Sequence, residues 1–112
     1  MEITNKVEGD LASLRITGRL DAATSPNLEQ AVNVAVEKGS QRIVFDMRDV
    51  SYVSSAGLRA ILLAAKKTKA AGGGVAVFGL QPAVEEVFTV SGFGKIIPIV
   101  PTDAEARQKL GA

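Results

Sequence analysis

Two adjacent serines, Ser54 and Ser55, follow a buried strand and a loop and open a predicted helix. At a helix N-terminus the first backbone N–H groups have no partner within the helix, and the helix dipole adds a partial positive charge. A phosphate on Ser55 would therefore be compatible with the fold, because this position already favours anions. Ala56 and Gly57 are small, and we expect them to leave the hydroxyl open to another protein's active site. The alternative is that both serines only cap the helix, a position that serine favours.

The absence of histidine and cysteine restricts the catalytic chemistry that this chain can perform. Serine and cysteine nucleophiles depend on a neighbouring base such as histidine, and common zinc sites use histidine and cysteine. Asp46 and Asp49 flank the predicted loop, but no nucleophile system accompanies them, so we expect them to accept hydrogen bonds from loop N–H groups. We therefore predict that the chain is not an enzyme and holds no cofactor or metal.

Charge and hydropathy exclude further classes of protein. Thirteen Lys and Arg residues against twelve Asp and Glu residues give a formal charge of +1, so we expect neither nucleic acid nor an anionic membrane as a partner. No apolar run approaches the ~20 residues of a membrane-spanning helix, and the N-terminal segment lacks the pattern of a signal peptide. We predict a cytoplasmic protein with no membrane insertion. Its 112 residues, 46% of them hydrophobic, suit a single domain over 1–112.

Hydrophobic periodicity predicts strands and helices along the whole chain. The predicted order is β-β-α-β-α-β-α-β-α, which indicates an α/β domain with a four- to five-stranded mixed sheet and about four helices. A Gly9-Asp10 turn joins the first two strands, and Lys38-Gly39 ends the first helix. The expected strands cover 3–7, 11–17, 43–45, 75–78 and an edge strand at 96–99. The expected helices begin at Ser25-Pro26, with Ser25 as the N-cap and Pro26 as the first helical residue, and at Ser54-Ser55, Pro82 and Thr102.

Three other features have both a structural and a functional interpretation. The glycines at 72–74 follow a helix and precede a strand, the reverse of a phosphate-binding loop, so we expect a helix stop. Lys66, Lys67 and Lys69 complement the negative end of that helix, or they contact an acidic partner. Phe93 is either an exposed apolar contact or a residue that folds back onto the core.

Three motifs of this chain occur together: Leu20-Asp21 after Gly18, Asp-Met-Arg-Asp-Val at 46–50, and Ser-Ser-Ala-Gly-Leu at 54–58. In combination they resemble the STAS domain of bacterial anti-sigma factor antagonists, and the predicted element order is similar to that family's fold over essentially the whole chain. The resemblance implies a partner-switching protein. Its unphosphorylated form would bind an anti-sigma factor with serine kinase activity and so release a sigma factor. A serine phosphatase is a further partner that the resemblance implies.

The resemblance places the phosphorylated serine at Ser55, with Ser54 as the second choice. The family pattern is usually Asp-Ser-[Ser/Thr]-Gly, whereas here Ser54 replaces the aspartate and Ala56 replaces the second hydroxyl residue. Some relatives are phosphorylated at the position of Ala56, which cannot accept phosphate. Asp21 is linked to partner or nucleotide contact, or it is a loop cap. The expected partner-binding residues are Asp21, Thr24, Ser54, Ser55, Ala56, Gly57 and Arg59.

An alternative function belongs to a different class of protein. STAS-like domains also serve as scaffold subunits of larger signalling or transport assemblies, without a phosphorylation cycle. The unusual residues at Ser54 and Ala56 are compatible with such a role. This alternative predicts a stable oligomer or co-purification with a membrane complex, and no phosphate on any serine.

Overall fold

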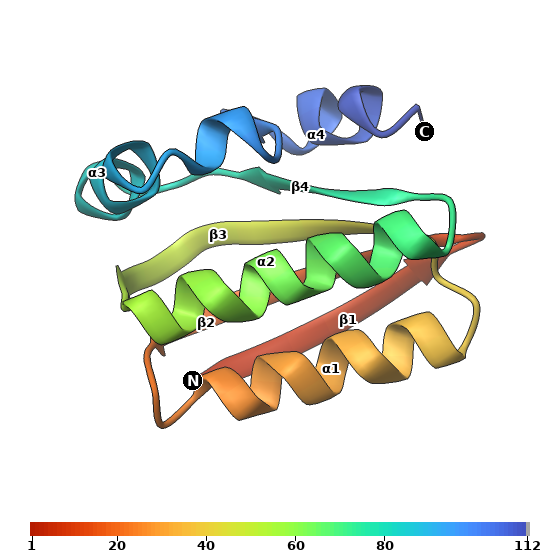
Figure 1. Ribbon diagram of the computed structural model, residues 1–112, viewed down its shortest axis with the longest axis horizontal. Coiled ribbons are helices and arrows are strands. Elements are labelled where there is room, and N and C mark those ends of the chain that lie inside the picture. Colours follow the sequence, from red (N-terminus) through yellow and green to blue (C-terminus); the bar gives the residue numbers. More distant parts are fainter. Residues whose placement is uncertain (112) are drawn as a thin grey trace.

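A five-stranded mixed sheet forms the centre of the computed structural model, which describes residues 1–111 (Figure 1). The strands lie in sequence order, β1-β2-β3-β4-β5. β1 and β2 are antiparallel, and Gly9, with a left-handed φ of 62°, supplies the turn between them. From β2 onward every neighbouring pair is parallel. The strands are β1 (Glu2–Glu8), β2 (Leu11–Leu20), β3 (Arg42–Val53), β4 (Gly74–Phe78) and β5 (Ile99–Val100).

Helices cover the two faces of this sheet unequally. Three of them, α1, α2 and α3, contribute buried side chains to one large apolar core, and α1 and α2 lie side by side along the sheet in Figure 1. α4 alone packs on the opposite face, where Ala106 meets Val44, Ala76 and Phe78. The helices are α1 (Ser25–Glu37), α2 (Ser55–Ala70), α3 (Pro82–Val90) and α4 (Asp103–Lys109), with a 3-10 turn, η1 (Phe93–Lys95), after α3.

The predicted fold class and element order are confirmed. The expected stop signals also act as predicted, since Gly39 follows the C-cap of α1 with a φ of 100° and Gly72 follows α2 with a φ of 91°. Thr102 caps α4 by accepting a hydrogen bond from the Glu105 N–H at 3.2 Å. Phe93 folds back onto the core, where its ring packs edge-on against Phe88 with 5.5 Å between the ring centroids.

Three predicted boundaries were wrong. β3 continues through the polar segment that was expected to leave the sheet and ends at Val53. The polar side chains of this segment form ion pairs and hydrogen bonds with other residues of the sheet, so they do not end the strand. The apolar run 96–99 begins in the turn that follows η1, and only Ile99 belongs to β5. Thr24, rather than Ser25, precedes the first residue of α1, and the Ser25 hydroxyl donates to the Asp21 carbonyl oxygen at 2.5 Å.

Arginine side chains hold α4 and the residues after it near the β1–β2 hairpin. The Arg107 guanidinium pairs with Glu8 at 2.8 Å and with Asp103 at 2.9 Å. At the start of β3, Arg42 donates to the Leu110 carbonyl oxygen at 3.1 Å and to the Asp10 carboxylate at 3.0 Å. The C-terminal segment is therefore fixed at the end of the sheet where β3 begins.

Candidate functional site

The Ser54-Ser55 segment lies where the parallel strands β2 and β3 end. Parallel neighbours finish at the same edge of a sheet, so the loops that follow them are brought together. The Ser54 N–H donates to the Leu20 carbonyl oxygen at 2.9 Å, which ties the start of α2 to the last residue of β2. The structure thus brings the Asp21 loop beside the two serines.

The two serines have different structural roles. Ser54 has an extended backbone, and its Oγ accepts a hydrogen bond from the Gly57 N–H at 3.3 Å, so Ser54 is the N-cap of α2. Its carbonyl oxygen accepts the first helical hydrogen bond, from the Leu58 N–H at 3.0 Å. Ser55 is the first residue of the helix and is exposed. Ser54 therefore caps the helix, and Ser55 is the exposed serine.

Gly57 is buried, in contrast to the expectation that it keeps the surroundings of Ser55 open. A Cβ atom at this position would lie 2.8 Å from both Cγ and the carbonyl oxygen of Leu20, and 3.1 Å from Cγ1 of Val53. Both distances are shorter than an ordinary van der Waals contact. The role of this glycine in the structure is to let the first turn of α2 approach the end of β2.

Asp21 organises the loop between β2 and α1. Its Oδ1 accepts hydrogen bonds from the N–H groups of Ala23 and Thr24, at 3.1 and 3.2 Å, and from the Thr24 hydroxyl at 3.1 Å. Burial raises the pKa of Asp21, but these hydrogen bonds and the neighbouring Arg19 guanidinium outweigh it, so the pKa lies below its ordinary value. The loop-cap interpretation of Asp21 is therefore confirmed, and the carboxylate brings a fixed negative charge to this edge.

The other predicted site residues lie on the first turns of α2 and in the Asp21 loop. Arg59 is exposed and follows Ser55 by one helical turn, while Ala56 is half-buried between Ser55 and Gly57. Thr24 is half-buried, and its hydroxyl also donates to the Arg19 carbonyl oxygen at 2.8 Å. Ser55 and Arg59 are thus the most accessible side chains of the predicted set on α2.

Asp46 and Asp49 do not belong to this site. Both lie within β3, where Asp46 pairs with Arg48 at 2.7 Å and Asp49 pairs with Arg15 at 2.5 Å. Burial raises the pKa of Asp46, but hydrogen bonds from the Arg48 guanidinium and backbone N–H outweigh it and hold the pKa below its ordinary value. Asp46 does accept a backbone N–H, from Arg48 at 3.2 Å, as expected, but the expected loop is a strand, and Asp49 pairs with an arginine side chain instead.

The groove beside Ser55 was not predicted from the sequence. It has a volume of about 400 Å³ and runs between α2 and α3, and Ser55 forms part of its wall. The signal was present in α3, where Ala83, Val87 and Val90 form an apolar stripe at i, i+4 and i+7 in addition to the buried stripe of Val84 and Phe88.

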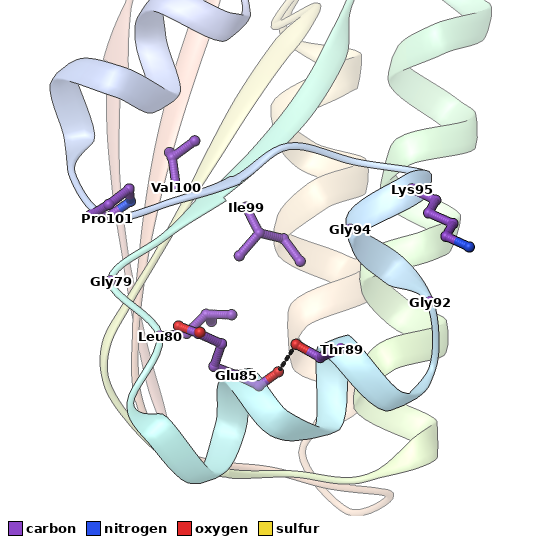
Figure 2. Close-up of a pocket in the computed structure, with 10 residues that line it drawn as sticks. All are labelled: Gly79, Leu80, Glu85, Thr89, Gly92, Gly94, Lys95, Ile99, Val100 and Pro101. Atoms are coloured by element: carbon purple, nitrogen blue, oxygen red, sulfur yellow. Dashed lines mark hydrogen bonds between the residues drawn. The ribbon is translucent and has the colours of Figure 1, made fainter.

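A second hollow, of about 650 Å³, lies near the ends of β4 and β5 (Figure 2). Leu80, Ile99 and three glycines form much of its lining, and the Thr89 hydroxyl donates to the Glu85 carbonyl oxygen at 2.9 Å. The Lys95 side chain points away from it in Figure 2. This hollow is separated from Ser55 by α3. Within residues 1–111 no cluster of acidic residues could hold a metal ion, and none of the helices described there is long and apolar enough to cross a membrane.

Comparisons with known proteins identify the family. Residues 2–106 match the STAS domain family. BtrV of Bordetella bronchiseptica, named as a candidate anti-sigma factor antagonist, is 38% identical over 100 residues, which are 88% of this chain and 85% of BtrV. The chain therefore belongs to the STAS domain family.

Solved structures share this fold at low sequence identity. A Thermotoga maritima protein, crystallised as a candidate anti-sigma factor antagonist, superposes with a TM-score of 0.90 at 22% identity and covers 98% of this chain and 95% of its own. SpoIIAA, an anti-sigma factor antagonist solved in unphosphorylated and phosphorylated forms, gives a TM-score of 0.74 for each, at 18% and 20% identity. The two SpoIIAA forms cover 99% and 96% of this chain, and the alignments span 99% and 98% of their own lengths.

Proposed function

We propose that this chain is an anti-sigma factor antagonist that acts in the cytoplasm. Its unphosphorylated form binds an anti-sigma factor with serine kinase activity and releases a sigma factor, and phosphorylation of Ser55 ends the complex. A serine phosphatase returns the chain to its binding form. The names of the relatives support the class, and the existence of a phosphorylated form of SpoIIAA supports the modification.

The observation that carries this proposal is the position of Ser55 on α2. Ser55 is an exposed residue at the first position of the helix, while the neighbouring hydroxyl of Ser54 supplies the cap. A phosphate on Ser55 would lie where the helix dipole favours negative charge, so the fold tolerates it. The modification therefore changes the surface without removing an interaction that holds α2 in place.

The switch acts through electrostatic repulsion. Phosphorylation adds about 1.5–2 negative charges, and like charges set against each other in an interface cost several kcal/mol. A serine kinase presents the phosphates of its nucleotide to the acceptor hydroxyl, so phosphoserine meets negative charge there. A penalty of about 3 kcal/mol would weaken the complex on the order of a hundredfold.

Binding measurements with three Ser55 variants test this mechanism. We expect Ser55→Asp to weaken binding of the anti-sigma factor strongly. Ser55→Ala has no hydroxyl to phosphorylate, so we expect it to bind constitutively. Both variants should have melting curves close to that of the wild-type chain. Ser55→Asn is the matched control, because it has the shape of aspartate without its charge. Wild-type affinity of Ser55→Asp would disprove the electrostatic switch.

Mass measurement of the chain isolated from its native cell tests the modification itself. The proposal predicts an added phosphate that maps to Ser55. If no serine carries phosphate and the chain instead purifies in a stable oligomer or with a membrane complex, the scaffold function is correct and the switch is wrong.

A further inference from the structure

The outer edge of β1 is open. β1 is the first strand in the order of the sheet, so within residues 1–111 it has a neighbouring strand, β2, on one side and none on the other (Figure 1). Six of its seven residues are exposed, and Ile3 is half-buried. The backbone N–H and C=O groups along an open edge can pair with a strand of another chain. β1 therefore offers a long template for such pairing.

β1 lacks the features that usually protect an open edge. Proteins block such edges with proline, with bulges, with very short strands or with charges that point inward. β1 contains no proline, and its register with β2 is uninterrupted. Its side chains on the helix-covered face, Ile3, Asn5 and Val7, are uncharged and lie opposite core residues of β2. The opposite edge of the sheet differs, because β5 has only two residues.

The helix beside this open edge has an uncharged face. A hollow of about 460 Å³ lies between β1 and α1. The side chains that α1 contributes to it follow the spacing of one helical face and are Asn27, Gln30, Ala31 and Val34. Three of these four residues are exposed, Val34 among them. An exposed helix face without charge is unusual for a surface that meets water, whereas the centre of a protein interface is depleted in charged residues.

The sequence of β1 complements itself in one antiparallel register. When Thr4 of one copy lies opposite Thr4 of a second copy, each Glu2 faces a Lys6. Opposite charges and threonine pairs across neighbouring strands stabilise a sheet, whereas like charges destabilise it. The helices of both copies stay on the same face only if the register shifts by two residues. Such a shift sets Glu2 against Glu8 in one direction and against Thr4 in the other, so charge selects the register centred on Thr4.

We propose that β1 pairs with β1 of a second copy of this chain, in the antiparallel register that sets Thr4 against Thr4. The two sheets then form one continuous sheet about a twofold axis, and the uncharged faces of the two α1 helices come together over the joined edges. A strand of another protein could pair with the edge, but it would not supply the second helix face. A second copy supplies both.

This arrangement leaves the candidate site accessible. Antiparallel pairing of the two β1 strands makes β3 of one copy run opposite to β3 of the other. Ser54 and Ser55 follow the end of β3, so the two pairs of serines lie toward opposite ends of the joined sheet. The proposed dimer surface is therefore separate from the proposed function, and neither depends on the other.

Sedimentation velocity over a wide range of protein concentrations tests the pairing. Lys6→Glu sets a like charge against Glu2 of the other copy, and Glu2→Lys sets one against Lys6. Because the twofold axis repeats each contact, we expect each single substitution to raise the Kd of the dimer about tenfold or more. The double variant Glu2→Lys/Lys6→Glu restores the opposite charges, and its Kd should lie within about threefold of the wild-type value.

Two valine substitutions test the helix face. Val34→Lys places a charge on the uncharged face of α1 and should prevent dimer formation. Val90→Lys makes the same change on α3, at a valine that is 83% exposed, and should dimerise as the wild-type chain does. All variants should show the wild-type helix content by circular dichroism, because the altered side chains are exposed.

Hydrogen exchange locates the contact, since peptides that cover β1 should exchange more slowly at high protein concentration than at low concentration. A chain that stays monomeric at every concentration would overturn the proposal and leave the edge to a strand of another protein. A dimer that Val90→Lys dissociates and Val34→Lys leaves intact would also overturn it, because another surface would hold the two copies. Failure of the double charge swap to restore the dimer would disprove the Thr4 register.

Discussion

The close approach of α2 to the end of β2 predicts that Gly57→Ala destabilises the protein. The added Cβ would lie 2.8 Å from the Leu20 carbonyl oxygen, and that oxygen also accepts the Ser54 N–H. Moving the first turn of α2 away from the end of β2 would relieve this clash, but it would also weaken the hydrogen bond between Ser54 and Leu20. Alanine normally favours a helix over glycine, so the two effects on the free energy of unfolding oppose each other.

The steric effect should be the larger of the two. Overpacking of this kind costs about 1–3 kcal/mol, whereas the gain in helix propensity from glycine to alanine is at most about 1 kcal/mol. The net loss is about 1–2 kcal/mol, which for a chain of this size lowers the Tm by roughly 4–8 °C.

Thermal and urea unfolding followed by circular dichroism measure this effect. Gly94→Ala is the matched control, because a Cβ at Gly94 would meet only Cδ1 of Ile99, at an ordinary distance of 3.9 Å. We expect this control to unfold at the wild-type temperature or slightly above it. A Gly57→Ala protein as stable as the wild type would refute the argument that close packing requires this glycine.

Two further substitutions test the cap and the buried carboxylate. Ser54→Ala removes the N-cap hydrogen bond and should lower the free energy of unfolding by about 1 kcal/mol in urea titrations, whereas Ser55→Ala should change it little; equal stability of these two variants would contradict the assigned cap. Asp46→Asn removes the carboxylate that Arg48 stabilises. The folded-state pKa of Asp46 lies below its ordinary value of about 3.9, so its contribution is present above that pH and is lost as the pH falls through the folded-state value. The variant should therefore be less stable than wild type near neutral pH, and urea titrations at decreasing pH should show the difference shrink in acid; a difference that stays constant would contradict the ion-pair argument.

Most elements could be predicted because each has a local signal. Gly9-Asp10 marks a hairpin, Pro82 begins α3, and Thr102 with Glu105 caps α4. The end of β3 could not be predicted in the same way. Asp46 suggested an exit from the sheet, but its charge is neutralised by a side chain of the same strand, and residue types alone do not reveal such pairing.

The position of the candidate site was predictable, but its internal arrangement was not. Leu20-Asp21 and Ser54-Ser55 follow neighbouring strands, and the fold class places such loops together. Which serine caps α2 depends on the residue at which the helix begins, and a sequence pattern leaves this uncertain by one or two residues. The buried position of Gly57 and the α2–α3 groove depend on contacts between separate elements, which periodicity does not describe.

The attachment of the C-terminal segment has a practical consequence for studying this protein. Arg42 holds Leu110 where β3 begins, whereas α2 starts at Ser55, two residues after β3 ends at Val53. Leu110 and Ser55 therefore lie at opposite ends of the longest strand, whose course is seen in Figure 1. A fluorescent label attached at Leu110 would lie at the end of β3 remote from the serines. Surface immobilisation through such a label would leave Ser54 and Ser55 facing the solution.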